Sequence, residues 1–208
     1  MNPWLLALLW TWWCAVHSLL ITPAVVAHMR KRLDGAFRFY RLFYNLFALV
    51  TAAPLVYLGF SIRGVPVFSW QGPLRIVQLA MLLAAAALFL GGMRHYDGLQ
   101  FFGLRQIRGA DSCAALSDDC RLTTDGALSL VRHPWYAGGL LVLWARDIDT
   151  ATLAVNLVLS AYLVIGAWLE ERKLAIQFGT AYHEYRQRVS AFFPLKWIVR
   201  KIGHRSRR

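Results

Sequence analysis

The sequence predicts an all-α fold, a polytopic bundle of about five transmembrane helices that includes a C-terminal helical hairpin. Three observations lead to this prediction. Apolar residue types make up 58% of the 208 residues, they gather into runs long enough to cross a bilayer, and every second link between the runs is basic. Because the runs are continuous rather than alternating, they favour helices, whose backbone groups bond within their own segment, over the strands of a barrel.

The first three spans are predicted in the N-terminal half of the chain. The run at 3–27 has no basic segment before it and no small-residue cleavage site after it, so it predicts a retained helix, which Pro23 can bend. The second span is expected at 42–60, interrupted by Pro54. The third, at 74–93, is rich in small residues that suit close packing between helices.

The last two spans are predicted as a helical hairpin at 134–146 and 148–169. The apolar run at 136–145 is too short to cross a bilayer alone, and the polar residues RDID (146–149) separate it from a full-length run. The first arm is therefore expected to be short or tilted. Such an arm brings polar groups to membrane depth, which is tolerated where they line a cavity rather than face lipid.

The one sizeable polar link, at 94–133, divides into two parts. Its aromatic start, 95–106, is expected to be ordered against the membrane face, and its middle, GADSCAALSDDC (109–120), is expected to be a flexible excursion. Cys113 and Cys120 lie in this middle part, on the side that the topology assigns to a reducing compartment. They predict structural thiols rather than a disulfide framework or a zinc site, and no metal is expected.

The positive charge predicts the orientation of the chain. The net charge is +12, and of the 23 Lys and Arg residues only Arg63, Arg75 and Arg146 lie outside the link after the first span, the link after the third span and the tail. By the positive-inside rule, the C-terminus is cytoplasmic and the N-terminus lies outside. The charge also indicates contact with anionic membrane lipids, and no nucleic-acid partner is expected. Within the first basic link, 37–45 alternates basic and aromatic residues and is expected to lie among the lipid headgroups.

A polar motif, RHPWY (132–136), stands where the long link enters the hairpin. Proline fits the first turn of a helix and leaves free backbone donors there, which suit an anionic or polar group. Arg and His beside it add charge-assisted donors. An interfacial anchor explains the motif equally well on spacing alone, because Arg, Trp and Tyr all favour the headgroup level.

Two further polar features follow the motif. Glu170 and Glu171 stand at the inner end of the last predicted span, where carboxylates are costly unless they face a cavity or a partner. A vicinal pair suits paired hydroxyls or an ammonium group, and a solvated turn with internal ion pairs is the alternative. The segment 178–189 predicts an amphipathic helix at the interface, on which Tyr182 and Tyr185 share a face.

Together these motifs resemble the isoprenylcysteine carboxyl methyltransferase and phospholipid methyltransferase superfamily of membrane enzymes. The resemblance covers about residues 123–194 and is carried by RHPWYAG (132–138), EERKL (170–174), FGTAYHEYRQRV (178–189) and FFP (192–194). The N-terminal part is similar to the methanethiol S-methyltransferase and NnrU-like branch, in CAVHSLLITPAVVAHMRKRL (14–33), FRFYRLFYNLFALVT (37–51) and FFGLRQ (101–106).

The resemblance implies one methyltransferase-like domain over 1–208, with a three-span part at 1–93 and a cofactor-binding part at 94–208. It implies S-adenosylmethionine as cofactor and a bacterial cytoplasmic membrane location, with the site open to the cytoplasm. The acceptor is expected to be a small or lipophilic thiol, with an isoprenylcysteine carboxylate or a phospholipid amine as alternatives. The cofactor-site candidates are Arg132, His133, Pro134, Tyr136, Gly138, Glu170, Glu171, Tyr182 and Tyr185.

Catalysis on a thiol requires loss of its proton, because the thiolate is the nucleophile. His133 and Arg172 are the candidates to assist, and the sequence does not choose between them. The candidates for binding the acceptor are His17, Gln106 and Tyr162, although a packed, hydrogen-bonded role also fits His17. Two functions of another class stay open, a non-enzymatic membrane carrier and an NADPH-dependent membrane reductase. No paired half-repeats of the kind that transporters show are evident.

Overall fold

The structure is a computed structural model that describes residues 3–94, 98–107 and 122–205. The chain forms two compact units. Unit 1 comprises Met1–Gln71, Gly98–Ser112 and Arg146–Tyr162, and unit 2 comprises Gly72–Asp97, Cys113–Ala145 and Leu163–Arg208. The described residues are mostly helical, as predicted, and the single-domain organisation stays a prediction.

Three helical stretches in the described part of the chain are long and apolar enough to cross a membrane. They are Pro23–Ser61, Leu74–Met93 and Thr150–Phe178, and Trp4–Leu20 is a shorter apolar helix. These stretches agree with an integral membrane protein. The number of five spans and the orientation of the chain stay predictions.

Unit 1 begins with two helices where the sequence predicted one. Helix α1 (Pro3–Leu20) ends before Pro23, and α2 (Pro23–Leu33) starts there, so the prediction of a single helix over 3–27 is wrong. The reason is local: proline lacks the N–H that would bond to the preceding turn, and its ring suits the first position of a new helix, which Thr22 can cap. Thr22 caps α2, since its Oγ1 accepts a hydrogen bond from the N–H of Val25 at 3.4 Å.

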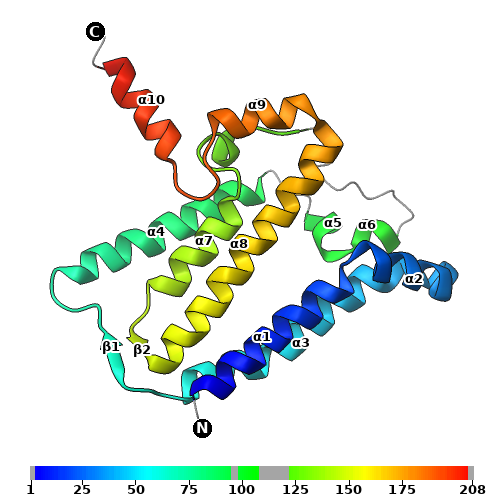
Figure 1. The fold of residues 1–208 in the computed structure, drawn as a ribbon, viewed down its shortest axis with the longest axis horizontal. Helices are drawn as coiled ribbons and strands as arrows, with labels where there is room; N and C mark the ends of the chain where they lie inside the picture. Colours follow the sequence, from blue (N-terminus) through cyan, green and yellow to red (C-terminus); the bar gives the residue numbers. More distant parts are fainter. Residues whose placement is uncertain (1–2, 95–97, 108–121, 206–208) are drawn as a thin grey trace. The chain divides into compact units, whose positions relative to one another are not determined.

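The next part of unit 1 is a 3₁₀ helix, η1 (Asp34–Phe39), followed by helix α3 (Tyr40–Ser61). Pro54 lies inside α3, which runs through it, so the predicted interruption is wrong. Figure 1 shows α1 and α3 side by side, and Trp13 on α1 donates to Oγ1 of Thr51 on α3 at 2.9 Å. Two short helices, α5 (Gly98–Phe102) and α6 (Leu104–Ile107), confirm order in the described start of the long link. Residues 95–97 and 109–120, with Cys113 and Cys120, lie outside the described residues.

A short antiparallel pair of strands in unit 1 was not predicted. Strand β1 (Pro66–Phe68) pairs with β2 (Ile148–Asp149), which directly precedes helix α8 (Thr150–Phe178) (Figure 1). The carboxylate of Asp149 accepts a hydrogen bond from the N–H of Thr152 at 2.7 Å and so caps α8. Burial raises the pKa of Asp149, but hydrogen bonds from Thr152 and Gly64 outweigh burial and hold the pKa below its usual value.

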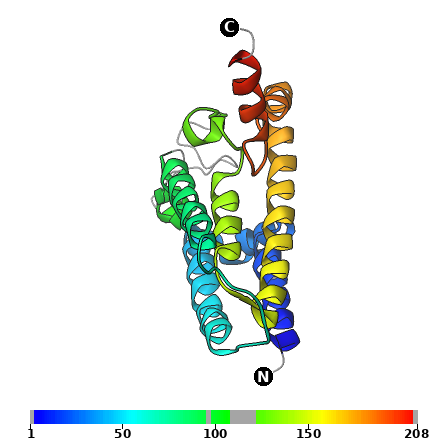
Figure 2. The same ribbon diagram turned by 90° about the vertical axis from the view of Figure 1, so that its left-hand side faces the viewer.

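Unit 2 is built on the packing of α4 (Leu74–Met93) against α7 (Pro134–Trp144), which lie side by side in Figures 1 and 2. A Cβ on Gly138 would lie 3.1 Å from the Phe89 ring, so glycine allows the close approach. Gly92 faces Trp135 in the same way, and Trp135 donates its indole N–H to the carbonyl of Phe89 at 3.2 Å. Gly92 therefore confirms the close helix packing predicted for the small residues of the span at 74–93.

Helix α8 continues to Phe178, beyond the predicted end of the last span at residue 169. Glu170 and Glu171, which the sequence places at the inner end of the last span, lie within the helix. Glu, Arg and Lys are strong helix formers, so EERK extends the helix rather than ending it. Gly179, with φ at +55°, then turns the chain into α9 (Thr180–Arg188). The last helix of unit 2 is α10 (Leu195–Arg205).

Candidate functional site

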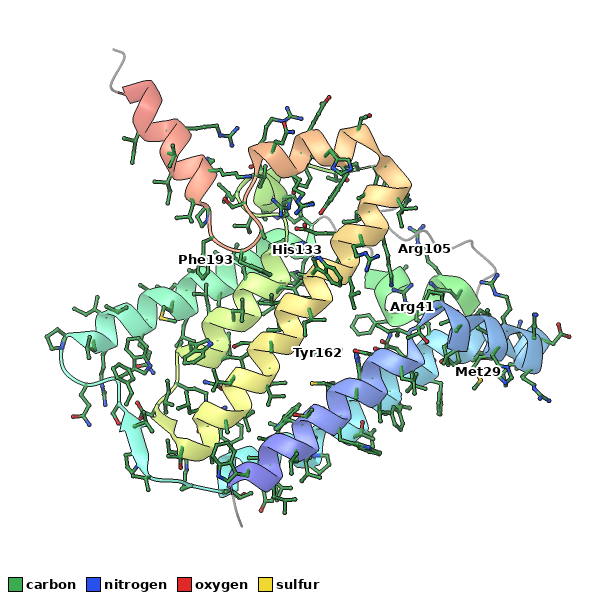
Figure 3. All side chains as sticks on the ribbon, viewed as in Figure 1. Met29, Arg41, Arg105, His133, Tyr162 and Phe193 are labelled. Carbon is green, nitrogen blue, oxygen red and sulfur yellow. The ribbon has the colours of Figure 1, made fainter. Side chains whose placement is uncertain are left out.

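Unit 2 brings the RHP motif and the twin glutamates together, as the sequence predicted. The Arg132 guanidinium donates to Oε1 of Glu171 from Nε at 3.0 Å and from Nη2 at 2.5 Å. His133 Nε2 lies 3.1 Å from the same carboxylate oxygen. The other oxygen, Oε2, lies 3.5 Å from Nε of Arg186 on α9. Figure 3 shows His133 at the start of α7.

The backbone holds this cluster in place from two sides. Pro134 occupies the first turn of α7, so His133 stands directly before the helix. The N–H groups of Arg132 and His133 donate to the carbonyls of Ser190 and Ala191, at 2.8 Å and 3.1 Å. The Arg132 side chain also donates from Nη1 to the carbonyl of Val189. The chain that returns after α9 is thereby fixed against the RHP motif.

The two glutamates have different surroundings. The Glu171 side chain is only 11% exposed, and Arg132, His133 and Arg186 surround both of its oxygens. The Glu170 side chain is 30% exposed, and its Oε2 lies 3.9 Å from Nδ1 of His133. A buried carboxylate must be paired to be tolerated, which Glu171 is. Glu171 therefore orients the other members of the cluster, whereas Glu170 is available to a ligand.

Helix α9 contributes two buried tyrosines to this part of unit 2. The Tyr185 hydroxyl donates to the carbonyl of Leu128 at 2.7 Å. Burial, and next the charge of Glu171, raises the pKa of Tyr182 to about 12, and burial also raises the pKa of Tyr185. Both side chains therefore stay neutral phenols near neutral pH. Both are also buried in the same cluster, which confirms that they share a face of α9.

Two buried polar atoms near Glu171 have no hydrogen-bond partner among the described residues. They are the Tyr182 hydroxyl and His133 Nδ1. Buried polar atoms in native proteins are nearly always hydrogen-bonded, so each atom left over needs an explanation. A polar ligand bound here would give both atoms a hydrogen-bond partner.

Tyr136 lies beside the cluster. Its ring is edge-on to the imidazole of His133, with 5.4 Å between ring centroids. A Cβ on Gly166 of α8 would lie 3.2 Å from the Tyr136 ring, so glycine makes room for it. The structure therefore brings this predicted site residue to His133.

Two other predicted site residues do not join the cluster. Gly138 faces α4 and the ring of Phe89. Arg172 lies on an exposed side of α8, where its guanidinium stacks on the ring of Trp168 at 4.9 Å. No ion pair within the described part of the chain links Arg172 to either glutamate. The roles predicted for Gly138 and Arg172 stay predictions that their contacts do not favour.

An open hollow of about 580 Å³ lies next to the Arg132 side chain. Its size is within the range of small-molecule sites, and its lining is strongly basic. The sequence analysis used the basic residues of the tail only as a signal of topology and of contact with anionic lipids. The return of the chain after α9 is what brings Arg186 and Lys196 to the hollow beside Arg132. The lining residues are Arg132, His183, Arg186, Gln187, Ser190, Ala191 and Lys196.

Unit 1 holds a second polar cluster around His17. The Tyr162 hydroxyl lies 2.5 Å from His17 Nδ1, so two of the predicted acceptor-binding residues do meet. The Tyr44 hydroxyl bonds His17 Nε2, and the Trp13 ring stacks on the imidazole at 4.9 Å. Sequence reasoning missed Tyr44 because it placed 37–45 among the lipid headgroups. The spacing of Tyr44 on α3 gave no sign that it would face α1.

Gln106, the third predicted acceptor-binding residue, has a local structural role in unit 1. One end of its side-chain amide lies 3.1 Å from the carbonyl of Gly103 and the other lies 3.2 Å from Nη1 of Arg41, which suits an amide N–H that donates to Gly103 and an amide oxygen that accepts from Arg41. These bonds tie α6 to the start of α3, where Figure 3 labels Arg41. Binding of an acceptor by Gln106 stays a prediction.

Comparison with known proteins agrees with these observations. The family described as "NnrU protein" matches residues 5–200. "Methanethiol S-methyltransferase 2" of Bradyrhizobium diazoefficiens is 29% identical over 197 residues, which are 91% of this chain and 72% of the relative. "Methanethiol S-methyltransferase 1" of the same organism is 30% identical over 159 residues, which are 74% of this chain and 55% of the relative.

A shorter match extends to the wider superfamily. "Protein-S-isoprenylcysteine O-methyltransferase" of Schizosaccharomyces pombe is 35% identical over 83 residues, which are 37% of this chain and 34% of the relative. No solved structure matches this chain. The resemblance predicted from the motifs is confirmed, and the names of the relatives agree with the predicted class of enzyme. The chain thus belongs to the NnrU family, among relatives that are named as methyltransferases.

Proposed function

We propose that this protein is a membrane methyltransferase that uses S-adenosylmethionine to methylate a small or lipophilic thiol. The observation that carries the proposal is the meeting of Arg132 and His133 with Glu171, next to two buried polar atoms that lack partners. The names of the relatives supply the reaction class and the first choice of acceptor. The cytoplasmic opening of the site and the five-span topology are part of the same proposal.

The residues around the cluster fit the methyl donor by their chemistry. S-adenosylmethionine carries ribose hydroxyls, an ammonium group, a sulfonium and a carboxylate. Glu170 is partly exposed and suits the hydroxyls or the ammonium group, and the Tyr182 hydroxyl and His133 Nδ1 each need a polar partner. The basic hollow beside Arg132 suits the carboxylate.

The bond between His133 and Glu171 defines what the imidazole can do. A carboxylate only accepts, so a neutral His133 must carry its proton on Nε2 and donate it to Glu171 at 3.1 Å. Nδ1 then keeps its lone pair and can accept a proton. His133 is therefore our candidate for the base that takes the thiol proton, with Glu171 fixing its tautomer and Arg132 fixing Glu171.

When bound, S-adenosylmethionine supplies an electrophilic methyl group. The protein must then align the thiolate with the S–CH₃ bond, and such positioning is worth about 7–11 kcal/mol in favourable cases. The exclusion of water matters as well, since thiolate and sulfonium neutralise each other as the bond forms. Burial of His133, which is 1% exposed, provides a dry place for the proton transfer.

We propose that His17 and Tyr162 in unit 1 bind the acceptor by offering hydrogen bonds to a thiol or its polar substituents. It rests on the 2.5 Å contact between the two side chains and on the expense of polar groups inside apolar helices.

Calorimetric titration of the purified protein in nanodiscs with S-adenosylmethionine and with NADPH tests the proposal. Binding of the methyl donor alone is the expected result. Binding of NADPH alone would favour a reductase, and binding of neither would favour a non-enzymatic membrane protein. Radiolabelled methyl transfer to small thiols, prenylcysteines and phospholipid amines then identifies the acceptor, and transfer to small thiols is expected to be fastest.

A further inference from the structure

Helix α10 has an apolar face that nothing in the described part of the chain covers. Its apolar residues recur at intervals of three and four and so line one side of the helix. Their exposed fractions are 64% for Leu195, 39% for Ile198, 69% for Val199 and 64% for Ile202. In water, an exposed apolar stripe of this length is unfavourable and marks an interaction surface.

The other side of α10 is basic. Lys196, Arg200 and Lys201 stand there, and the sequence of α10 contains no acidic residue. Lys201 also lies over the ring of Trp197, with its Nζ 4.4 Å from the centroid. A helix with this division between apolar and cationic sides is typical of segments that lie in the plane of a membrane surface.

We propose that α10 rests in the interface of the membrane and binds an anionic phospholipid surface through its apolar stripe and its basic side chains. The charge selects this partner, since each Lys or Arg near an anionic leaflet adds about 1 kcal/mol of attraction. A second copy of the chain fits less well. Four side chains are few for a stable protein interface, which buries about 800 Å² on each partner, and the like charges of two α10 helices repel.

The start of α10 is fixed to the rest of unit 2. The N–H of Lys196 donates to Oγ of Ser190 at 3.1 Å, and its Nζ donates to the carbonyl of Arg186 at 2.9 Å. Phe193, labelled in Figure 3, is 58% exposed directly before the helix and adds an aromatic side chain to the surface offered to lipid. The turns after Lys196 are therefore the part of α10 that reaches the bilayer.

Spin labels on neighbouring residues of opposite faces test the proposal without any methyl donor. The background is the full-length protein with Cys113→Ser and Cys120→Ser, in which Cys14 can stay because it is buried and does not take up label. A single cysteine is then introduced for labelling, either Val199→Cys or Arg200→Cys. The samples are nanodiscs of phosphatidylcholine alone or mixed with phosphatidylglycerol. In mixed nanodiscs, the label at 199 is expected to collide more with oxygen, which concentrates in lipid. The label at 200 is expected to collide more with a water-soluble nickel chelate.

Two results would overturn the proposal. Equal access of both labels to the nickel chelate would place α10 in water. Protection of the label at 199 from both oxygen and nickel, in every lipid, would indicate a protein partner such as a second copy. Neither result bears on methyl transfer, so failure here is separate from failure of the proposed function.

Charge variants give a second, matched readout. Arg200→Gln with Lys201→Gln is expected to weaken docking roughly fivefold for each residue changed, seen as nickel access at 199 in mixed nanodiscs. The control, Lys173→Gln with Arg188→Gln, removes the same charge from exposed positions on α8 and α9. It is expected to leave access at 199 unchanged. An equal effect of both pairs would contradict specific docking by α10.

Discussion

The two polar clusters of the protein use different chemistry. In unit 2, His133 is bonded to a carboxylate, Glu171, which Arg132 also holds. In unit 1, His17 is bonded to the phenols of Tyr162 and Tyr44 and to no charged group among the described residues. The first cluster stands where the α7 and α9 segments meet α8, and the second lies among apolar helices, where unpaired charge would be expensive.

The difference determines what each histidine can do. When His133 is neutral, the Glu171 carboxylate fixes its tautomer, with the proton on Nε2 and the lone pair on Nδ1. A phenol can donate or accept, so the proton of His17 can sit on either nitrogen while both hydroxyls stay bonded. The proposed base, His133, thus has its neutral tautomer set by a neighbour, whereas His17 can stay hydrogen-bonded in either tautomer.

The largest expected effect is that of Glu171→Gln. Removing one member of a buried ion pair costs about 3–5 kcal/mol, because the Arg132 charge stays buried without its partner. We expect a lower melting temperature, followed by intrinsic fluorescence, and loss of S-adenosylmethionine binding in calorimetry. A variant that melts and binds like the parent would remove Glu171 from the cluster that we describe.

Glu170→Gln is expected to separate binding from stability. Glu170 is partly exposed and has only a 3.9 Å contact with His133 Nδ1, so its loss leaves the fold intact. A hydrogen bond to a charged group is worth about 1.5–3 kcal/mol, so the affinity for the donor should fall roughly 10- to 150-fold. Glu171→Gln makes the same substitution at the neighbouring position, so the two variants can be compared directly in stability and in donor affinity. An equal loss of stability in both variants would show that the two glutamates are not distinct.

Tyr162→Phe tests the uncharged cluster. The variant removes one hydroxyl and leaves His17 Nδ1 without that partner, which should cost about 1–3 kcal/mol of stability. The affinity for the donor is expected to stay at the parental value, and the KM for the thiol acceptor is expected to rise. Loss of donor binding without a change in acceptor KM would contradict the division of roles between the clusters.

Asp149→Ala gives the smallest expected effect and serves as a reference outside both clusters. Loss of the N-cap of α8 should cost about 1 kcal/mol at neutral pH. Because the folded pKa of Asp149 lies below its usual value, its contribution is present above the unfolded pKa of about 3.9 and is lost as the pH falls through the folded pKa. Melting curves of parent and variant should therefore converge at low pH, and a constant difference would contradict this.

The parts of the fold that the sequence predicted correctly are those with local signals. Helix α4 covers the predicted range, 74–93. Both of its ends have a local signal, since Gly72 and Pro73 precede it and the polar link follows it. The end of α8 could not be predicted, because EERK is compatible both with a solvated turn and with more helix. The pairing of β1 with β2 joins segments far apart in the chain, and neither segment has a strand pattern of its own.

The same limit applied to the candidate site. The spacing of Tyr182 and Tyr185 predicted their common face, and the resemblance to a family predicted that the RHP motif would meet the glutamates. The inequality of Glu170 and Glu171 could not be predicted, because it depends on the return of the chain after α9. The backbone pairing of 189–191 with 131–133 brings Arg186 to Glu171 and creates the basic hollow.

The position of the bound product would show whether the cluster around Glu171 is the donor site. We suggest determining an experimental structure of the full chain in nanodiscs with the product S-adenosylhomocysteine. We expect the Glu170 carboxylate and the Tyr182 hydroxyl to contact the bound molecule, while Glu171 stays bonded to Arg132 and His133. A product molecule bound elsewhere, with both buried polar atoms of the cluster still without a partner, would contradict this expectation.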